Sequence, residues 1–241
     1  MLFARVNVLI LLLFLFAGNS TVWSQDNQSG MTVYTIEPDP MVREQINEEA
    51  MAAYVTGSQL MSVNRLDEAE RYLLQAISLD PEFVDAMDHL GVVYRRLNRL
   101  SEAEQMYLRS ISINDKNRVP YINLAVVYRM QGRLNDAFEL YKKLIEIDPN
   151  DPEGYFGIGT IFYLVENFEA ALVFFDAAIL FYSAYNSPYV YHAYHYKGLI
   201  YYYMKNYEEA LWYLEEVKNS DMSVDGLDSI INDIRRILYN S

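Results

Sequence analysis

An internal repeat constrains this chain more than any other feature of its sequence. Leu-Gly-Val-Val-Tyr at residues 90–94 returns as Leu-Ala-Val-Val-Tyr at residues 124–128, a step of 34 residues. The same step aligns Glu-Ala at residues 102–103 with Asp-Ala at residues 136–137. A fixed period of this length is typical of repeat architectures, in which each unit completes its core only against its neighbours. The chain is therefore expected to stack copies of one small element.

The repeat predicts five units that are built alike. They cover residues 50–83, 84–117, 118–151, 152–185 and, after five extra residues, 191–224. In each unit, apolar residues recur every three or four positions, as amphipathic helices require. The pattern breaks at five pairs of residues: Asn64-Arg65, Asn98-Arg99, Gly132-Arg133, Glu166-Asn167 and Lys205-Asn206. Each unit is thus predicted to be a helix–turn–helix, with Asp67, Ser101 and Asn135 as N-caps of second helices.

The third unit carries the fullest motif, and with it a resemblance to a known family. Its motif residues are Tyr121, Leu124, Ala125, Tyr128, Ala137, Tyr141 and Pro149. This pattern resembles the tetratricopeptide repeat (TPR) family, and the five units cover about 175 of 241 residues. In the fifth unit Lys197 stands where the family has leucine. The resemblance implies an all-α fold: a right-handed superhelical solenoid of about five helix–turn–helix units.

The end of the chain predicts one further helix. Residues 225–239 place Leu227, Ile230, Ile231, Ile234 and Leu238 on one side of an amphipathic segment. A solenoid needs a terminal helix that covers its last apolar face, so this segment is expected to cap the repeats.

The N-terminus predicts export. A single positive charge in residues 1–5 precedes an apolar run at residues 8–17, and small and polar residues follow. This order is typical of a secretory signal. Ten helical residues rise about 15 Å, roughly half of a bilayer's hydrocarbon core, so an uncleaved anchor is the weaker alternative. We expect a signal peptide at 1–24, a polar linker at 25–40, the solenoid at 41–241, and a periplasmic or secreted protein without a stable membrane span after cleavage.

Composition and motifs argue against several classes of function. The formal charge of −14 argues against a nucleic-acid partner, and the absence of cysteine excludes disulfides and thiolate sites. There is no glycine-rich phosphate loop and no nucleophile motif. His192 and His195 lie one helical turn apart, but no third ligand is in register with them. We therefore expect no enzyme, no cofactor and no metal site.

The family resemblance also indicates where a partner would bind. First helices of successive units line a concave groove in that family, and reading this sequence by phase selects the residues that face it. The candidate groove residues are Tyr54, Asp88, Arg95, Asn123, Arg129, Phe156, Tyr163, His195 and Tyr202. Residues 95–143 hold ten Lys/Arg against five Asp/Glu, which favours an acidic partner segment. The alternative is that Arg95 and Arg129 only solvate a helix face.

Two functions remain open at this stage. The first is an exported scaffold that binds a segment of a partner protein or peptide in the groove, in bacterial envelope assembly or maintenance. The second is a structural subunit that forms a homo-oligomer or a larger complex through its tyrosine-rich end. Residues 182–213 hold eleven of the 22 tyrosines. Tyrosine is favoured in interfaces, although thicker core packing around the five-residue insertion would also explain this density.

Overall fold

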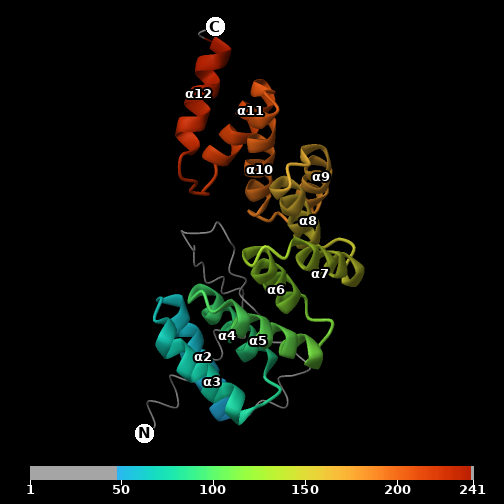
Figure 1. Cartoon of the computed structure of the whole chain (residues 1–241). Helices are drawn as coiled ribbons and strands as arrows, with labels where there is room; N and C mark the ends of the chain where they lie inside the picture. The colour runs from blue at the N-terminus through green and yellow to red at the C-terminus, as the bar shows by residue number, and fades with distance from the viewer. Residues whose placement is uncertain (1–47, 240–241) are drawn as a thin grey trace. The chain divides into compact units, whose positions relative to one another are not determined.

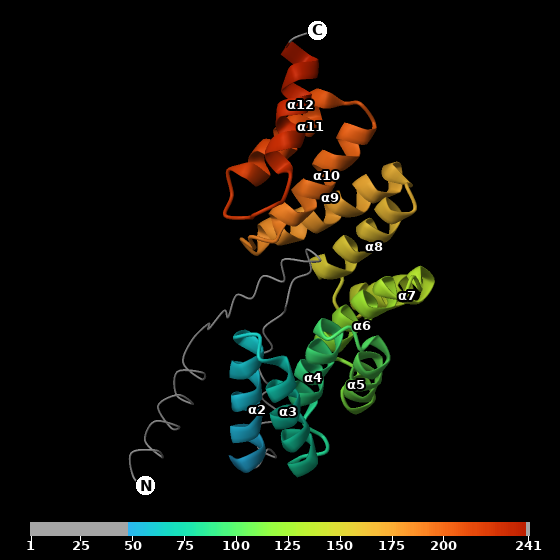
Figure 2. The ribbon, with the colours of Figure 1, turned by 60° about the vertical axis from the view of Figure 1, so that its left-hand side comes forward.

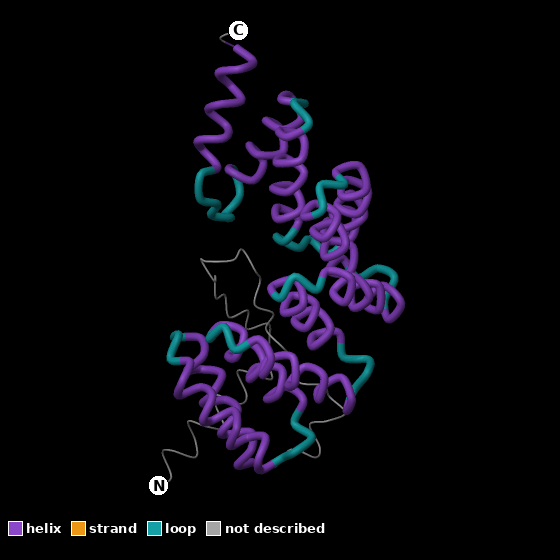
Figure 3. Tube along the Cα trace, viewed as in Figure 1, coloured by secondary structure: helices purple, strands orange, loops and turns teal. Residues whose placement is uncertain are grey.

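The computed structural model describes residues 48–239, which divide into two compact parts between Leu97 and Asn98. All regular structure in these residues is α-helical, and no strand occurs among them (Figure 3). The prediction of an all-α chain of paired helices is thus confirmed. The signal peptide and the linker lie outside the described residues. Within residues 48–239, no helix has the length and apolar character that crossing a membrane requires.

The first part consists of three helices. These are α2 (Glu48–Ser62), α3 (Leu66–Leu79) and α4 (Val84–Arg96). Helices α2 and α3 lie side by side, and α4 packs against both of them (Figure 1). Leu73 of α3 is fully buried, and a Cβ added to Gly57 of α2 would come within 2.8 Å of its Cγ. The small residue therefore lets the two helices approach closely.

The second part contains eight helices, each packed against the next. They are α5 (Leu100–Ile113), α6 (Arg118–Met130), α7 (Leu134–Ile147), α8 (Pro152–Leu164), α9 (Phe168–Ala184), α10 (Val190–Tyr203), α11 (Tyr207–Lys218) and α12 (Leu227–Tyr239). Figure 2 shows this succession from a second side. Helix α8 also contacts both α6 and α10, so first helices of successive units are neighbours. This layer of first helices positions the candidate site.

The turn inside each pair depends on one residue in the left-handed region. These residues are Asn64 (φ 61°), Asn98 (59°), Gly132 (75°), Glu166 (57°) and Lys205 (64°). They are the residues at which the apolar pattern of the sequence breaks. Glycine and asparagine adopt this conformation readily, whereas Glu166 and Lys205 adopt it at a cost of about 1–2 kcal/mol each.

The predicted N-caps of the second helices are wrong. Helices α3, α5 and α7 begin at Leu66, Leu100 and Leu134, so Asp67, Ser101 and Asn135 lie inside the first turn. The N-cap residues are arginines whose side chains do not cap the helix. Each arginine instead donates to a carboxylate three residues later, in the pairs Arg65–Glu68, Arg99–Glu102 and Arg133–Asp136. Carboxylates in the first turn also complement the helix dipole.

The structure explains why the fifth unit carries a lysine at a leucine position. Lys197 is 3% exposed, and its ammonium forms an ion pair with Asp176 of α9. The same ammonium lies 4.7 Å from the ring centroid of Tyr213. Burial alone would lower the pKa of Lys197, but hydrogen bonds with Asp176 and Tyr213 outweigh burial and raise it. The lysine that replaces the motif leucine is therefore stabilised by specific partners.

Helix α12 closes the C-terminal end of the repeats. Its Leu227, Ile231 and Ile234 form one buried cluster with residues of α11, among them Leu214 and Val217. The helix begins at Leu227, two residues later than the predicted segment. It covers the apolar face of the last pair, as a capping helix should.

We predict opposite effects on stability from two turn substitutions. Gly132→Ala should lower the free energy of unfolding by about 1 kcal/mol, because the alanine must adopt a positive φ. No heavy atom lies within 4 Å of the added Cβ, so a steric clash does not contribute. Glu166→Gly should raise the same quantity by about 0.5 kcal/mol. Urea denaturation of both variants checks this, and an unchanged stability of Gly132→Ala would contradict it.

Candidate functional site

The predicted groove residues fall in both compact parts. Tyr54, Asp88 and Arg95 belong to α2 and α4 of the first part. The second part carries the others: Asn123 and Arg129 on α6, Phe156 and Tyr163 on α8, and His195 and Tyr202 on α10.

The three candidates of the first part are buried. Tyr54 packs against Phe83 and His89, with ring centroids 4.9 and 5.0 Å apart. Burial, with the nearby Asp85 carboxylate, raises the pKa of the Tyr54 hydroxyl. Asp88 and Arg95 are buried as well, and Nε of Arg95 has no hydrogen-bond partner. These three side chains therefore lie in the interior of the first part and not on its exposed surface.

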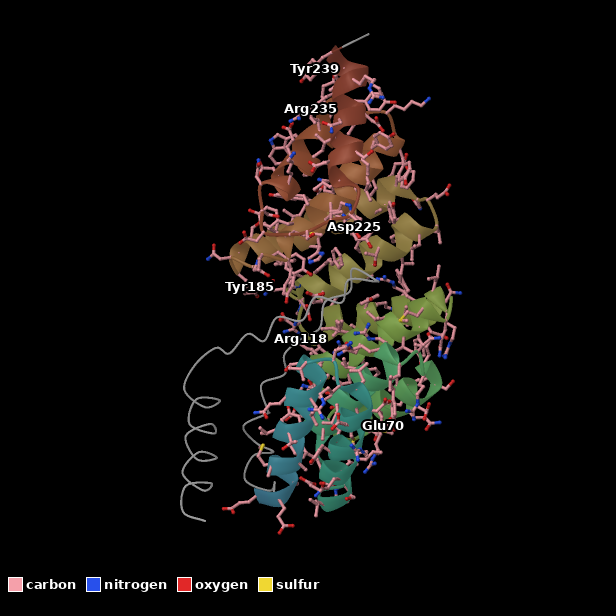
Figure 4. All side chains as sticks on the ribbon, turned by 90° about the vertical axis from the view of Figure 1, so that its left-hand side faces the viewer. Glu70, Arg118, Tyr185, Asp225, Arg235 and Tyr239 are labelled. Atoms are coloured by element: carbon pink, nitrogen blue, oxygen red, sulfur yellow. The ribbon has the colours of Figure 1, made fainter. Side chains whose placement is uncertain are left out.

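Two polar contacts hold α6 beside α8 in the second part. Nη1 of Arg129 donates to Oγ1 of Thr160 at 3.0 Å. At the start of the same helices, Nε of Arg118 donates to Oδ2 of the buried Asp151 at 2.5 Å, and Figure 4 labels this arginine. Asp151 is also the N-cap of α8 and accepts from the backbone N–H of Glu153. Both ends of α8 are thus tied to α6.

Asn123 does not line an open surface. Its side chain is buried, and its Nδ2 donates to the carbonyl of Val119 one turn earlier in α6, at 3.2 Å. The amide is therefore used within its own helix.

The remaining candidates belong to a connected group of rings on α8 and α10. This aromatic surface comprises Phe156, Tyr163, His192, His195, Tyr196 and Tyr202, all half-buried. Tyr196, which was not among the candidate groove residues, is central to the group. Its ring centroid lies 5.0 Å from that of Tyr163 and 5.7 Å from that of Phe156. His192 and His195 also contact this group, through Phe156 and Tyr196. Rings that are neither fully buried nor isolated offer apolar area together with hydroxyl groups.

Exposed apolar residues border the aromatic surface at the turns. Tyr203 is 56% exposed and stacks on Phe168 at 5.9 Å. Leu164 and Met130 occupy the matching place in the two preceding units and are exposed too. The first two units have Ser62 and Arg96 there. The residue at this position is therefore polar in the first two units and apolar in the last three. An alignment of the five units in the sequence would have revealed this change from polar to apolar residues.

Polar groups around the aromatic surface are few and are satisfied locally. The hydroxyl of Tyr182 donates to Oε1 of the buried Glu153 at 2.7 Å. Burial, with a contribution from His192, lowers the pKa of His195 to about 4, so this ring is neutral near pH 7. Within residues 48–239, no cluster of three or more His, Asp or Glu side chains is arranged to hold a metal ion.

We predict a pH dependence of stability from His89, which contacts Tyr54. Burial lowers the pKa of His89 to about 4, against an ordinary value of 6.5. The unfolded chain therefore binds the proton more readily, and stability falls as the pH drops from 6.5 toward 4. His89→Phe should reduce the stability lost between pH 7 and pH 5 by about 2 kcal/mol.

Urea denaturation at the two pH values measures this difference. The carboxyl groups titrate alike in both proteins, so their contribution cancels. If both proteins lose the same stability, the prediction fails.

Comparison with known proteins identifies the repeats. A family model described as tetratricopeptide repeat matches residues 54–117, and one described as TPR repeat matches residues 125–165. No curated protein sequence matches the chain.

Several solved structures share the fold. The crystal structure of the Cut9–Hcn1 hetero-tetramer of the APC/C matches with a TM-score of 0.70 and 18% identity, over 83% of this chain and 39% of that chain. PilF of Pseudomonas aeruginosa matches with a TM-score of 0.65 and 14% identity, over 80% and 93% of the two chains. YrrB, described as a TPR protein with an unusual peptide-binding site, matches with a TM-score of 0.51 and 24% identity, over 73% and 88%.

Proposed function

Because this chain contains tetratricopeptide repeats, we propose that it is an exported scaffold that binds a segment of a partner protein along its first helices. Repeat folds of this kind generally mediate contacts between proteins, through extended surfaces formed by successive units. The chain would act by holding its partner, and no reaction is assigned to it.

The aromatic surface of α8 and α10 is the observation that carries the proposal. Its rings are half-buried, they come from neighbouring first helices, and exposed apolar residues such as Leu164 and Tyr203 border them. Tyrosine is enriched among residues that dominate binding energy, because it buries a large ring while its hydroxyl finds a partner. YrrB, which has a similar fold, is described as having an unusual peptide-binding site.

The basic residues favour an acidic partner segment. Arg129 of α6 is half-buried, and its Nε has no hydrogen-bond partner. A buried guanidinium is costly unless an anion or acceptor accompanies it. A carboxylate of a bound segment would supply that acceptor, with two parallel hydrogen bonds to one arginine.

The compartment belongs to the same proposal. The charged, apolar and small-residue order of residues 1–24 favours a secreted or periplasmic scaffold, with a role in bacterial envelope assembly or maintenance.

A second candidate function rests on exposed aromatic residues toward the C-terminus. Tyr185, Tyr203, Trp212 and Tyr239 are all exposed. Self-assembly through these units would cover them, in which case the chain would be a structural subunit.

Site-specific photo-crosslinking tests the binding surface. Benzoylphenylalanine in place of Tyr163 or Tyr202 should give a discrete covalent adduct with one partner protein in native cells. The same replacement at Tyr72, which is exposed on α3, is the matched control and should give none. Adding Arg129→Glu should reduce the adduct severalfold if the bound segment is acidic.

Other outcomes of this experiment are equally informative. Adducts of two copies of the chain would favour self-assembly instead. Identical adducts at all three positions, or none at any, would contradict binding at the aromatic surface.

Export has its own test. The mass and N-terminal sequence of protein recovered from native cells should correspond to a chain that begins at Gln25, in an exported fraction. An intact N-terminus in the cytoplasmic fraction would contradict the proposal of export.

A further inference from the structure

Helix α9 has an apolar outer side in addition to its buried inner side. Ala171, Phe175, Ala178 and Tyr182 form the buried side. Residues two positions later, Val173, Ala177, Leu180 and Ala184, lie opposite them, because two steps along a helix rotate by about 200°. Val173 is 66% exposed and Leu180 is 64% exposed.

The matched helix of the preceding unit carries charged residues at these positions. A step of 34 residues places Val173, Asp176, Ala177 and Leu180 over Glu139, Lys142, Lys143 and Glu146 of α7. In α7 these four residues form two ion pairs on the surface, Lys142–Glu139 and Lys143–Glu146, at 3.1 and 3.4 Å. The side chain of Glu139 is 66% exposed, as Val173 is. The outer side of α9 is therefore equally open, but at these four positions it keeps one charge, Asp176, where α7 has four.

The four apolar residues follow the spacing of a helix-packing stripe. Positions 173, 177, 180 and 184 step by four, three and four, so they align along one face for about 16 Å. We call Val173, Ala177, Leu180 and Ala184 the outer stripe. Large and small residues alternate along it, which suits interdigitation with the side chains of another helix. Contiguous exposed apolar surface of this kind usually marks an interaction site.

The flanks of the outer stripe differ in chemistry. One flank carries Glu169 and Asp176, both exposed. The other carries Phe174 and Phe181, which are half-buried and stack on Phe162 and Tyr155 at 5.4 and 5.3 Å. Asp176 is paired with Lys197 of α10, whereas no ion pair involves Glu169 within the described residues. This flank of the stripe therefore offers the Glu169 carboxylate, in a chain whose formal charge is −14.

The acidic charge beside the outer stripe favours one kind of binding partner. A second copy of the chain would bring acidic surroundings against acidic surroundings, which is unfavourable. We propose that the outer stripe binds an amphipathic helix of another protein, whose apolar stripe is flanked by Lys or Arg. The apolar residues would supply the buried area, and a cation would pair with Glu169. This surface lies on the side of the unit opposite to the contacts of α9 with α8 and α10, so it is separate from the proposed binding surface on the first helices.

A designed peptide tests the proposal on the full-length protein. The probe is a fluorescein-labelled helix of Leu, Ala and Lys, with Leu at steps of four and three and Lys along one flank. A second probe has Glu in place of every Lys. Fluorescence anisotropy should show the Lys probe binding the wild-type protein at least tenfold more tightly than the Glu probe.

The decisive variant places the residues of α7 on α9: Val173→Glu/Ala177→Lys/Leu180→Glu. It adds one negative charge in total, so electrostatic attraction of the Lys probe does not fall, yet the apolar stripe is lost. Binding should weaken at least tenfold while circular dichroism stays unchanged. The control, Glu139→Gln/Glu146→Gln on α7, removes acidic charge elsewhere and should bind the Lys probe within twofold of wild type.

Three results would overturn the proposal. The Lys probe could bind the α9 variant as tightly as it binds wild type, which would mean that attraction is only electrostatic. The control could weaken binding as much as the α9 variant does, which would place the probe elsewhere. Light scattering could show concentration-dependent dimers of wild type that the α9 variant lacks, which would make a second copy the occupant of the outer stripe.

Discussion

Three helix pairs of this protein, those of the first, fourth and fifth units, depend on a close contact between a glycine of the first helix and a large side chain of the second. A Cβ at Gly159 would lie 2.9 Å from the Phe175 ring, and one at Gly198 would lie 2.6 Å from Leu214. The same contact joins Gly57 to Leu73 in the first unit. Interiors are packed so densely that such a contact leaves no room for an additional methyl group. The spacing between paired helices follows from it, and with it the orientation of every other face.

Once these inner faces are buried, the surfaces that remain differ from unit to unit. In α8 and α10 the free side of the first helix is aromatic, whereas in α6 it includes Arg129, which is tied to Thr160. On the second helices, α7 carries ion pairs and α9 carries the outer stripe. Repeated architecture thus provides equivalent positions, and substitution at those positions provides different binding surfaces. The fourth unit carries both an aromatic first helix and an apolar second helix, which makes it the richest in candidate contacts.

Charged groups within the fold are positioned mainly to support packing. Lys197 and Asp176, Arg118 and Asp151, and Glu153 with Tyr182 are each satisfied by partners on a different helix. Pairs with a buried member are costly to break, because the remaining group would be left without compensation. They specify which helices are neighbours, while the half-buried aromatic residues stay available.

The sequence by itself determined the repeat, the helix pairs and the turns, because period, apolar spacing and left-handed residues are local properties. Asn98 and Gly132 mark their turns in the chain as plainly as in the structure. The sequence also indicated Phe156, Tyr163, His195 and Tyr202 as candidates, because the position of a residue within the repeat predicts which side of the helix it occupies. Only the tertiary structure decided that Asn123 bonds within α6, that Arg99 rather than Ser101 precedes α5, and that Tyr196 joins the aromatic surface. These outcomes depend on long side chains choosing among partners on neighbouring helices, and that choice is made by three-dimensional packing rather than by position along the chain.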